Sequence, residues 1–289
     1  MNNTAFLAEV SSNHNRDFDR MKRFINVAAD IGCAGVKFQL FKIDELFDSS
    51  VLATTPNLQK RKAWELPEKF LPELSKYAHE MGIKFGCTPF YLDAVDILKP
   101  YVDFYKIASY EILWHDLFKK CATVDKPIIF STGMATLEEI ASAIRCLADN
   151  GCKDVTVLHC NSAYPTPIKD ANLRSIQTLR DELSIYERDM NIQIGWSDHT
   201  VSPGVIYRAV HKFRANIIEF HLDLDGQGEE YTSGHCWLPE DIKIVINNIN
   251  QGKDADGGGE LIPSDSELKE RDWRADPVDG LRPLKKFRV

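Results

Sequence analysis

The chain has 289 residues, of which 44% are hydrophobic, so it can bury the core of one large α/β domain or of two smaller ones. Its formal net charge of -8 and the shortness of its basic clusters exclude a surface that tracks nucleic-acid phosphates. No apolar run reaches the roughly 20 residues of a membrane span, and residues 1–10 lack the features of a signal peptide, so we expect a cytoplasmic protein.

Short apolar runs alternate with amphipathic segments along most of the chain. The runs have the length of buried strands, and the segments between them have the apolar spacing of helices. The predicted strands are residues 4–11, 35–41, 84–88, 104–109, 127–130, 155–158, 192–196 and 217–220. The predicted helices are 17–31, 67–81, 115–124, 136–150, 170–183 and 238–250, with shorter ones after residues 93 and 200. Eight strand-helix units in strict alternation predict an α/β fold, a (β/α)8 TIM barrel formed by residues 1–251.

Two segments depart from this alternation. Residues 44–62 are polar and irregular, and we interpret them as a long loop after the second strand, of the kind that forms lids or binding loops. From about residue 252 the chain is rich in Gly, Asp and Pro and shows no periodicity. We interpret residues 252–289 as a linker and an irregular, extended C-terminal arm.

Polar side chains stand at the ends of nearly all the predicted strands. In a barrel of this kind the carboxyl ends of the strands form one face, where the chemistry takes place. Several lysines and hydroxyls directed at one cavity suit the binding of phosphate and carboxylate together, although an ion pair with a barrel carboxylate would also explain each lysine. The set collected from the strand ends is Glu9, Lys37, Lys42, Thr88, Lys106, Ser109, Ser131, Ser162, Ser197, His199, Glu219 and His221.

The seven cysteines are odd in number, scattered and without a C-x-x-C pair, so we expect reduced thiols rather than disulfides. Cys87 and Cys160 stand near strand ends, where a nucleophile could act. A buried small hydrophobic side chain is the commoner role for an isolated cysteine, and we expect that role for both.

Residues 191–225 have the pattern of strand, turn, helix and strand, with one histidine at the end of each strand. A right-handed crossover between parallel neighbours would bring His199 and His221 side by side. Period-2 alternation directs Glu219, His221 and Asp223 to one face of the last strand. Two imidazoles with nearby carboxylates suit a divalent first-row metal, whereas local hydrogen bonding is the alternative for either histidine alone.

Eight segments in chain order resemble the sialic acid (N-acetylneuraminate) synthase family: AEVSSNHN, VKFQLFK, CTPF, YKIAS, STGMATLEEI, LHCNSAYPTP, GWSDHT and IEFH. The resemblance implies a (β/α)8 barrel that condenses phosphoenolpyruvate with the open-chain aldehyde of a sugar, such as N-acetylmannosamine or a related amino sugar, and releases phosphate. It also implies a nonulosonic acid product for surface polysaccharides and a homodimer.

The resemblance further implies roles for individual residues. Glu9 matches an acidic residue near the attacking water, and Glu219 matches the carboxylate of an E-x-H pair. Ser162 and Tyr164 lie in the loop that lines the substrate region. His199 and His221 match the two ligands of a divalent metal, Mn²⁺ or Mg²⁺. The residues that match phosphoenolpyruvate-binding positions are Lys37, Lys106, Ser109, Ser131 and Ser197, with Thr88 as their neighbour.

The chain departs from the family pattern in two places. The family usually continues after the last strand with a P-G-P-D segment, whereas residues 228–232 read GEEYT. The acidic residue of that segment is therefore replaced by Thr232 or supplied by Glu229 or Glu230. The family also adds a small C-terminal antifreeze-like domain, for which we expect no room in residues 252–289.

Two other classes of function remain compatible with the residues. A metal-dependent sugar isomerase or epimerase on the same barrel would use both histidines with Glu9 and Glu219, but it has no need for Lys37 and Lys106. A non-catalytic relative could bind a sugar or phosphate as a regulator. Turnover that requires both phosphoenolpyruvate and a sugar would separate the synthase from these alternatives.

Overall fold

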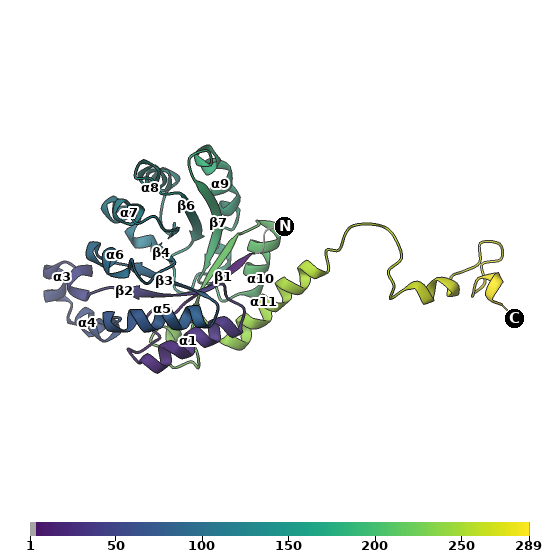
Figure 1. Cartoon of the computed structure of the whole chain (residues 1–289), viewed down its shortest axis with the longest axis horizontal. Coiled ribbons are helices and arrows are strands. Elements are labelled where there is room, and N and C mark those ends of the chain that lie inside the picture. Colours follow the sequence, from purple (N-terminus) through teal and green to yellow (C-terminus); the bar gives the residue numbers. More distant parts are fainter. Residues whose placement is uncertain (1–3, 289) are drawn as a thin grey trace. The chain divides into compact units, whose positions relative to one another are not determined.

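Residues 4–288 are described by the computed structural model, in which eight parallel strands form a closed barrel (Figure 1). The strands follow chain order around the sheet, and β1 pairs with both β2 and β8, which closes the ring. The strands are β1 Ala5–Glu9, β2 Gly35–Leu40, β3 Lys84–Pro89, β4 Phe104–Ile107, β5 Ile128–Ser131, β6 Asp154–Cys160, β7 Asn191–Asp198 and β8 Ile217–Leu222. The TIM barrel predicted from the sequence is confirmed.

Helices surround the barrel and cover the outer faces of its strands (Figure 1). Their starts follow local signals: Asp17 accepts a hydrogen bond from the backbone N–H of Arg20 at the start of α1, and Thr136 with Glu139 forms a capping box at α8. The main helices are α1 Phe18–Asp30, α5 Leu71–Glu80, α6 Leu92–Leu98, α7 His115–Ala122, α8 Leu137–Asp149, α9 Arg174–Leu183, α10 Pro203–Tyr207 and α11 Pro239–Asp254.

Side chains fill the barrel interior in layers. An apolar layer of Leu7, Phe104, Ile129 and Leu158 lies inside the ring of strands. Phe104 fits because β3 has Gly86 opposite it, where any Cβ would collide with the aromatic ring. Two residues further along β1, β4 and β5, the same face carries the polar side chains Glu9, Lys106 and Ser131. The apolar layer therefore forms the floor of the polar layer described below.

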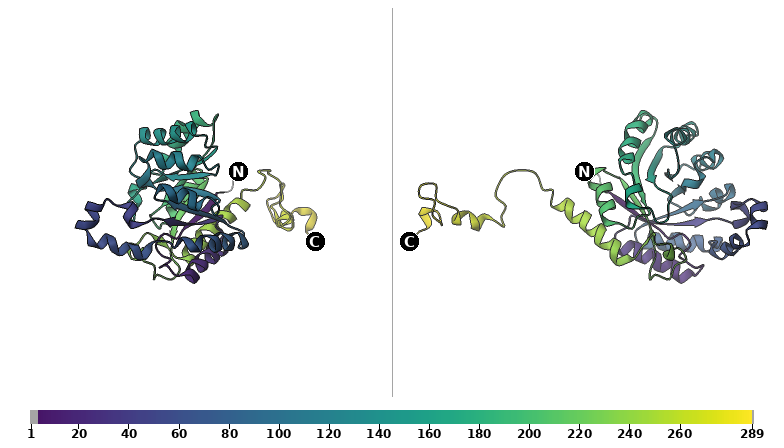
Figure 2. Two further views of the ribbon diagram at one scale, coloured as in Figure 1. Left: turned by 60° about the vertical axis from the view of Figure 1, so that its left-hand side comes forward. Right: turned by 180° about the vertical axis from the view of Figure 1, so that it is seen from behind.

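The segment after β2 corrects one expectation, because residues 44–62 form short helices rather than a loop. They are α2 Ile43–Leu46, α3 Ser49–Thr54, α4 Pro56–Gln59 and a 3-10 turn Lys60–Trp64, at the outer edge of the barrel unit in Figure 2. Ile43 and Leu52 pack with Phe41 in a small apolar cluster of their own, and Asp48 caps α3. Helices of four to six residues are too short to produce a visible apolar period.

The chain divides into two compact units, Met1–Ile249 and Asn250–Val289. The second unit contains 3-10 turns Leu268–Trp273 and Lys285–Phe287 and is joined internally by an ion pair between Asp279 and Arg288. Trp273 within it is 62% exposed. Among residues 4–288, no helix has the length and apolar character needed to cross a membrane.

A short ninth strand, β9 Cys236–Trp237, pairs in parallel with the end of β8. Its register places Cys236 opposite His221 and Trp237 opposite Leu222. The indole N–H groups of Trp196 and Trp237 each donate a hydrogen bond to the buried carboxylate of Asp198, at 3.1 and 2.9 Å respectively. This shared carboxylate ties β9 to the end of β7, directly before His199.

Candidate active site at the carboxyl end of the barrel

The polar layer lies at the carboxyl ends of the strands and lines a single cavity. Most of the twelve residues singled out from the sequence lie on its wall, and Ser162 adjoins it through Gly133 and Ser109. Lys42, by contrast, is half exposed and pairs with Glu68 at 2.9 Å, so it does not join the others. The predicted residues on the wall are Glu9, Lys37, Thr88, Lys106, Ser109, Ser131, Tyr164, Ser197, His199, Glu219 and His221.

Two lysines and two carboxylates form a buried charge network on the cavity wall. Lys37 pairs with Glu9, its register partner, and its Nζ lies 3.6 Å from Glu219. Lys106 Nζ lies 3.5 Å from the other oxygen of Glu219. Burial, with the neighbouring Lys106 charge, lowers the pKa of Lys37 to about 8 against the effect of Glu219. Burial would raise the pKa of Glu219, but the two lysines bring it down to about 2.

Hydroxyl groups gather on the β3 to β6 side of the cavity. The side-chain oxygens of Thr88, Ser131 and Ser162 are buried without a hydrogen-bond partner among the described residues. Ser109 Oγ accepts from the backbone N–H of Gly133 at 3.0 Å, and a Cβ on Gly133 would collide with Ser162. Buried hydroxyls without partners are costly unless a ligand supplies acceptors. This side of the cavity therefore suits an anion with several oxygens.

The two predicted metal ligands lie on the opposite side, with ring centroids 5.2 Å apart. Nδ1 of His199 lies 2.7 Å from the carbonyl oxygen of Asn161, and Nδ1 of His221 lies 3.0 Å from Glu230 Oε2. These contacts favour the tautomer in which each Nδ1 carries the proton and donates it in a hydrogen bond. Each Nε2 then keeps a lone pair that can bind a cation. Burial lowers the pKa of His199 to about 3 and also lowers that of His221, which keeps both rings neutral near pH 7.

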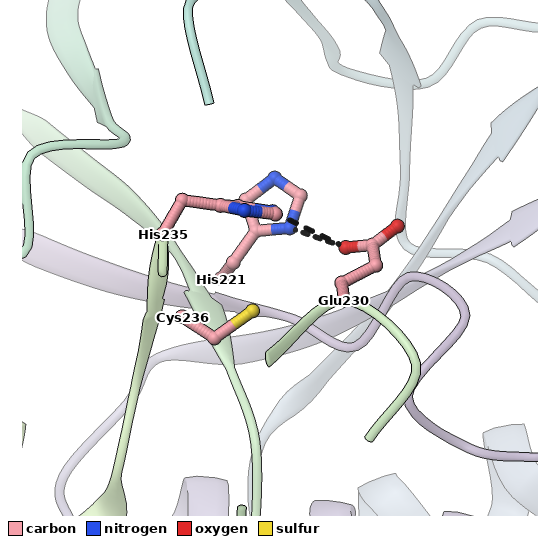
Figure 3. A group of neighbouring side chains, drawn as sticks. All are labelled: His221, Glu230, His235 and Cys236. Carbon is pink, nitrogen blue, oxygen red and sulfur yellow. Dashed lines mark hydrogen bonds and ion pairs between the residues drawn. The ribbon is translucent and has the colours of Figure 1, made fainter. Parts of the chain in front are cut away.

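A further group of possible ligands lies around His221 (Figure 3). It consists of His221, Glu230, His235 and Cys236, whose ligand atoms lie within 4.8 Å of one another. Of the three candidates for the family's acidic residue, Glu229 and Thr232 are exposed, and only Glu230 contacts the site. Burial would raise the pKa of Glu230, but hydrogen bonds from His221 and His235 hold it well below its usual range.

Sequence reasoning missed His235 and Glu111. The signal for His235 was weak, because its place beside His221 depends on β9, a strand of two residues. Glu111 lies in the 3-10 turn after β4, with one carboxyl oxygen buried and unpaired among the described residues. Burial raises its pKa to about 7 despite the nearby charge of Lys106. A carboxyl group with such a pKa can exchange a proton near neutral pH.

The cysteines behave as the sequence predicted. All seven are free and buried. Burial raises the pKa of Cys87 to about 12 and that of Cys160 to about 11, although charges of nearby lysines act against it. Both thiols therefore stay protonated, and neither has the low pKa that marks a nucleophile.

Residues 24–261 match the NeuB family. An uncharacterized protein of Methanocaldococcus jannaschii is 38% identical over 266 residues, covering 91% of this chain and 75% of the relative. The N,N'-diacetyllegionaminic acid synthase of Campylobacter jejuni is 36% identical over 282 residues, covering 93% and 82%. A solved structure of N-acetylneuraminic acid synthetase from Leptospira borgpetersenii superposes with a TM-score of 0.79 at 29% identity, covering 93% of this chain and 90% of that one.

Proposed function

The chain belongs to the NeuB family, and from this premise we propose that it condenses phosphoenolpyruvate with the open-chain aldehyde of an amino sugar. The product is a nonulosonic acid of the sialic acid type, and inorganic phosphate is released. Relatives named as acid synthases identify a condensing enzyme of the transferase type, rather than a sugar isomerase or a regulatory binding protein. We assign the catalysis to residues 1–251 and treat 252–289 as a separate arm.

The observation that carries the proposal is the division of one cavity into two kinds of donor. One set consists of two lysines, from β2 and β4, with hydroxyls that have no partner among the described residues, and the other set consists of the two imidazoles at the ends of β7 and β8. A phosphorylated carboxylic acid needs the first set, and an aldehyde oxygen that accumulates negative charge needs a cation at the second. The substrate of a metal-dependent sugar isomerase has no phosphate or carboxylate to accept hydrogen bonds from the hydroxyls of Thr88, Ser131 and Ser162.

Phosphoenolpyruvate would bind across the lysines and hydroxyls. Lys37 and Lys106 supply positive charge for its phosphate and carboxylate, and Ser109, Ser131 and Thr88 donate hydrogen bonds to its oxygens. Both lysines already pair with Glu9 and Glu219, so the free site is close to neutral and the lysines are held in place before the ligand arrives. Ser197 contributes by donating to Glu219 at 2.8 Å, which orients that carboxylate.

The sugar aldehyde would lie between phosphoenolpyruvate and the imidazoles. The donor set fits a divalent cation, because two neutral rings have Nδ1 engaged and Nε2 free. When bound there, Mn²⁺ or Mg²⁺ supplies Lewis-acid polarisation of a carbonyl oxygen. Tyr164 stacks on His199 with ring centroids 4.2 Å apart, and its exposed edge can contact the sugar. Ser162 lies on the same loop.

The bonds exchange in a defined order. The enol carbon of phosphoenolpyruvate attacks the aldehyde carbon, whose oxygen becomes a hydroxyl. Water then adds to the carbon that bears phosphate, with Glu9 placed to accept a proton from it. The carbon-oxygen bond to phosphate breaks in the resulting tetrahedral intermediate, phosphate leaves with the electron pair, and the added hydroxyl loses its proton to become the ketone of a 2-keto acid. The two protons that water releases balance the one that the aldehyde oxygen takes up and the one that leaves with phosphate.

Three broader features of the function follow from the same proposal. The relative named N,N'-diacetyllegionaminic acid synthase supports an acetylated amino sugar as the acceptor, and a relative named spore coat polysaccharide biosynthesis protein supports surface polysaccharide as the destination. The buried free thiols are compatible with the reducing cytoplasm, where phosphoenolpyruvate is available, and we place the reaction there. The homodimer stays a prediction that analytical ultracentrifugation would test.

A phosphate-release assay tests the proposed function. Purified protein would be incubated with phosphoenolpyruvate, Mn²⁺ and a panel of N-acetylated and diacetylated amino sugars, with each substrate omitted in turn. We expect phosphate release only when both substrates are present, and a product whose mass equals sugar plus pyruvate. Sugar conversion without phosphoenolpyruvate would instead establish an isomerase. Phosphate release that ignores the sugar would contradict a condensation.

A further inference from the structure

Glu230 lies at the meeting point of three segments. Its Oε2 contacts His221 Nδ1 at 3.0 Å and lies 3.5 Å from His235 Nε2, as Figure 3 shows for the first pair. Its other oxygen accepts a hydrogen bond from the hydroxyl of Ser11. The side chain is 23% exposed and His221 is 10% exposed, so the contact between them is largely shielded from water.

The loop that carries Glu230 is itself held in place. The backbone N–H of Glu230 donates to Asn13 Oδ1 at 2.8 Å, and Asn13 Nδ2 donates to the carbonyl oxygen of Leu222 at 3.0 Å. Gly228 is required at its position, because a Cβ there would collide with Asn13 and Asp223. These contacts fix the backbone of residue 230, and with it the direction of the carboxylate toward His221.

Glu230 stands behind His221 as seen from the cavity. His221 and His199 line the cavity, whereas Glu230, His235 and Cys236 do not. A histidine that binds a cation commonly donates its other ring N–H to a carboxylate or a carbonyl, which fixes the tautomer and the ring orientation. Asn161 provides such an acceptor for His199, and Glu230 provides it for His221.

We propose that Glu230 is a positioning residue for the cation site, which holds the His221 ring with Nδ1 protonated and Nε2 directed into the cavity. The inference rests on the proposed function and deepens it, because it assigns the acidic residue of this loop to the histidine rather than to the sugar. His235 Nε2 lies 3.5 Å from the same carboxylate oxygen and gives it a second contact. Its Nδ1 is buried without a partner among the described residues.

One rival arrangement uses the same residues differently. A cation could bind between His221, Glu230 and His235, since two imidazoles and one carboxylate form a known ligand set. In that arrangement Glu230 would be a ligand, the cation would lie behind the cavity, and His199 would play no part. The two arrangements therefore predict different losses of affinity when His199 or His235 is replaced.

Direct measurement of Mn²⁺ binding tests the proposal without reference to turnover. Calorimetry or electron paramagnetic resonance would give the Mn²⁺ dissociation constant of wild-type protein and of Glu230→Ala, Glu230→Gln, His199→Ala and His235→Ala. Glu229→Ala and Glu229→Gln are the matched controls, because Glu229 is the adjacent carboxylate on the same loop and is exposed. Thermal unfolding would verify that each variant is folded.

We expect Glu230→Ala to weaken Mn²⁺ binding by about 10- to 100-fold, as is typical when the partner of a ligating histidine is removed. Glu230→Gln keeps an acceptor of the same shape and should recover part of this loss. Both Glu229 variants should bind as the wild type does. In metal-free protein, the ¹⁵N shifts of His221 should report a protonated Nδ1 in the wild type and a mixture of tautomers in Glu230→Ala.

Wild-type affinity in folded Glu230→Ala would overturn the proposal. It would also be overturned if His199→Ala retained affinity while His235→Ala lost it, because the cation would then bind in the rival arrangement. Should Glu230→Ala fail to fold, Glu230→Gln decides through the same affinity and ¹⁵N measurements. If only the proposed function were wrong, the wild type would turn over no sugar, but its Mn²⁺ affinity would still fall in Glu230→Ala.

Discussion

The two sides of the barrel mouth differ in how their polar groups are satisfied. On the β3 to β6 side, the hydroxyls of Thr88, Ser131 and Ser162 are buried with no partner among residues 4–288. On the β7 to β9 side, His199 and His221 each have an acceptor at Nδ1, and Ser197 donates to Glu219. Both sides begin on the same apolar floor and lie at the same ends of parallel strands.

The difference indicates what each side is built to receive. A buried donor without an acceptor lowers the stability of the free protein. This cost is offset only when a ligand supplies acceptor oxygens, as phosphate does. Fixed imidazoles have already lost their freedom to rotate, so they present a rigid pair of nitrogens to a cation. One side is therefore completed by the ligand, and the other is preorganised by the protein. The predictions below test this contrast, beginning with the largest effect.

Removing either imidazole should abolish cation binding at the preorganised side of the cavity. His199→Ala or His221→Ala removes a nitrogen donor, and we expect the cation affinity and the rate of condensation to fall by orders of magnitude. The melting temperature should change little, because the site lies at the barrel mouth and not in the apolar core. Turnover after chelation and Mn²⁺ add-back measures the effect. Full activity in both single variants would show that these histidines do not hold the cation.

Removing a lysine should weaken the binding of phosphoenolpyruvate. Lys37→Met or Lys106→Met loses a charge-assisted contact worth roughly 1.5 to 3 kcal/mol, which corresponds to an increase of about 10- to 150-fold in KM for phosphoenolpyruvate. Lys42→Met is the matched control, because Lys42 pairs with Glu68 outside the cavity. Steady-state kinetics with each substrate varied in turn would separate the subsites. A change confined to the KM of the sugar would show that the lysine binds the sugar and not phosphoenolpyruvate.

The pH dependence of phosphoenolpyruvate binding should follow Lys37. Burial lowers the pKa of this lysine to about 8, below its ordinary value of 10.5. The charged form that binds phosphate is therefore present below pH 8 and is lost as the pH rises through 8. We expect KM for phosphoenolpyruvate to increase by roughly fivefold between pH 8 and 9 while KM for the sugar stays level. A flat profile from pH 7 to pH 9.5 would contradict the assignment.

A pair of serine variants should show the contrast in stability. Ser131→Ala removes a hydroxyl with no partner in the free protein, so the free energy of unfolding should stay level or increase, while KM for phosphoenolpyruvate rises roughly 2- to 10-fold. Ser197→Ala breaks a hydrogen bond to a buried carboxylate and should cost roughly 1.5 to 3 kcal/mol of stability. Urea unfolding with and without phosphoenolpyruvate measures both. Equal losses of unfolding free energy in Ser131→Ala and Ser197→Ala would contradict the proposed difference between the two sides of the barrel mouth.

The sequence by itself determined the barrel and the residues of its mouth. Alternation of strand and helix patterns is a local property, and in a parallel barrel it leaves one arrangement in which all carboxyl ends share a face. Glu9, Lys37 and His221 could therefore be grouped before their contacts were known, although they are separated by up to 212 positions. The helix starts at Asp17 and Thr136 were equally visible, because the capping side chain accepts a hydrogen bond from a backbone N–H only three residues further on.

Only the tertiary structure decided how these groups pair. Glu230 was one of three candidates in the sequence, and it became the partner of His221 because Asn13 and Gly228 fix the loop. His235 obtains its place beside Glu230 through a strand of two residues, and Glu111 obtains its place near Lys106 through a single 3-10 turn, and neither element has a readable period. The helices within residues 44–62 escaped detection for the same reason. Periodicity reports which face a side chain takes over several turns or pleats, whereas these residues obtain their positions from single long-range contacts.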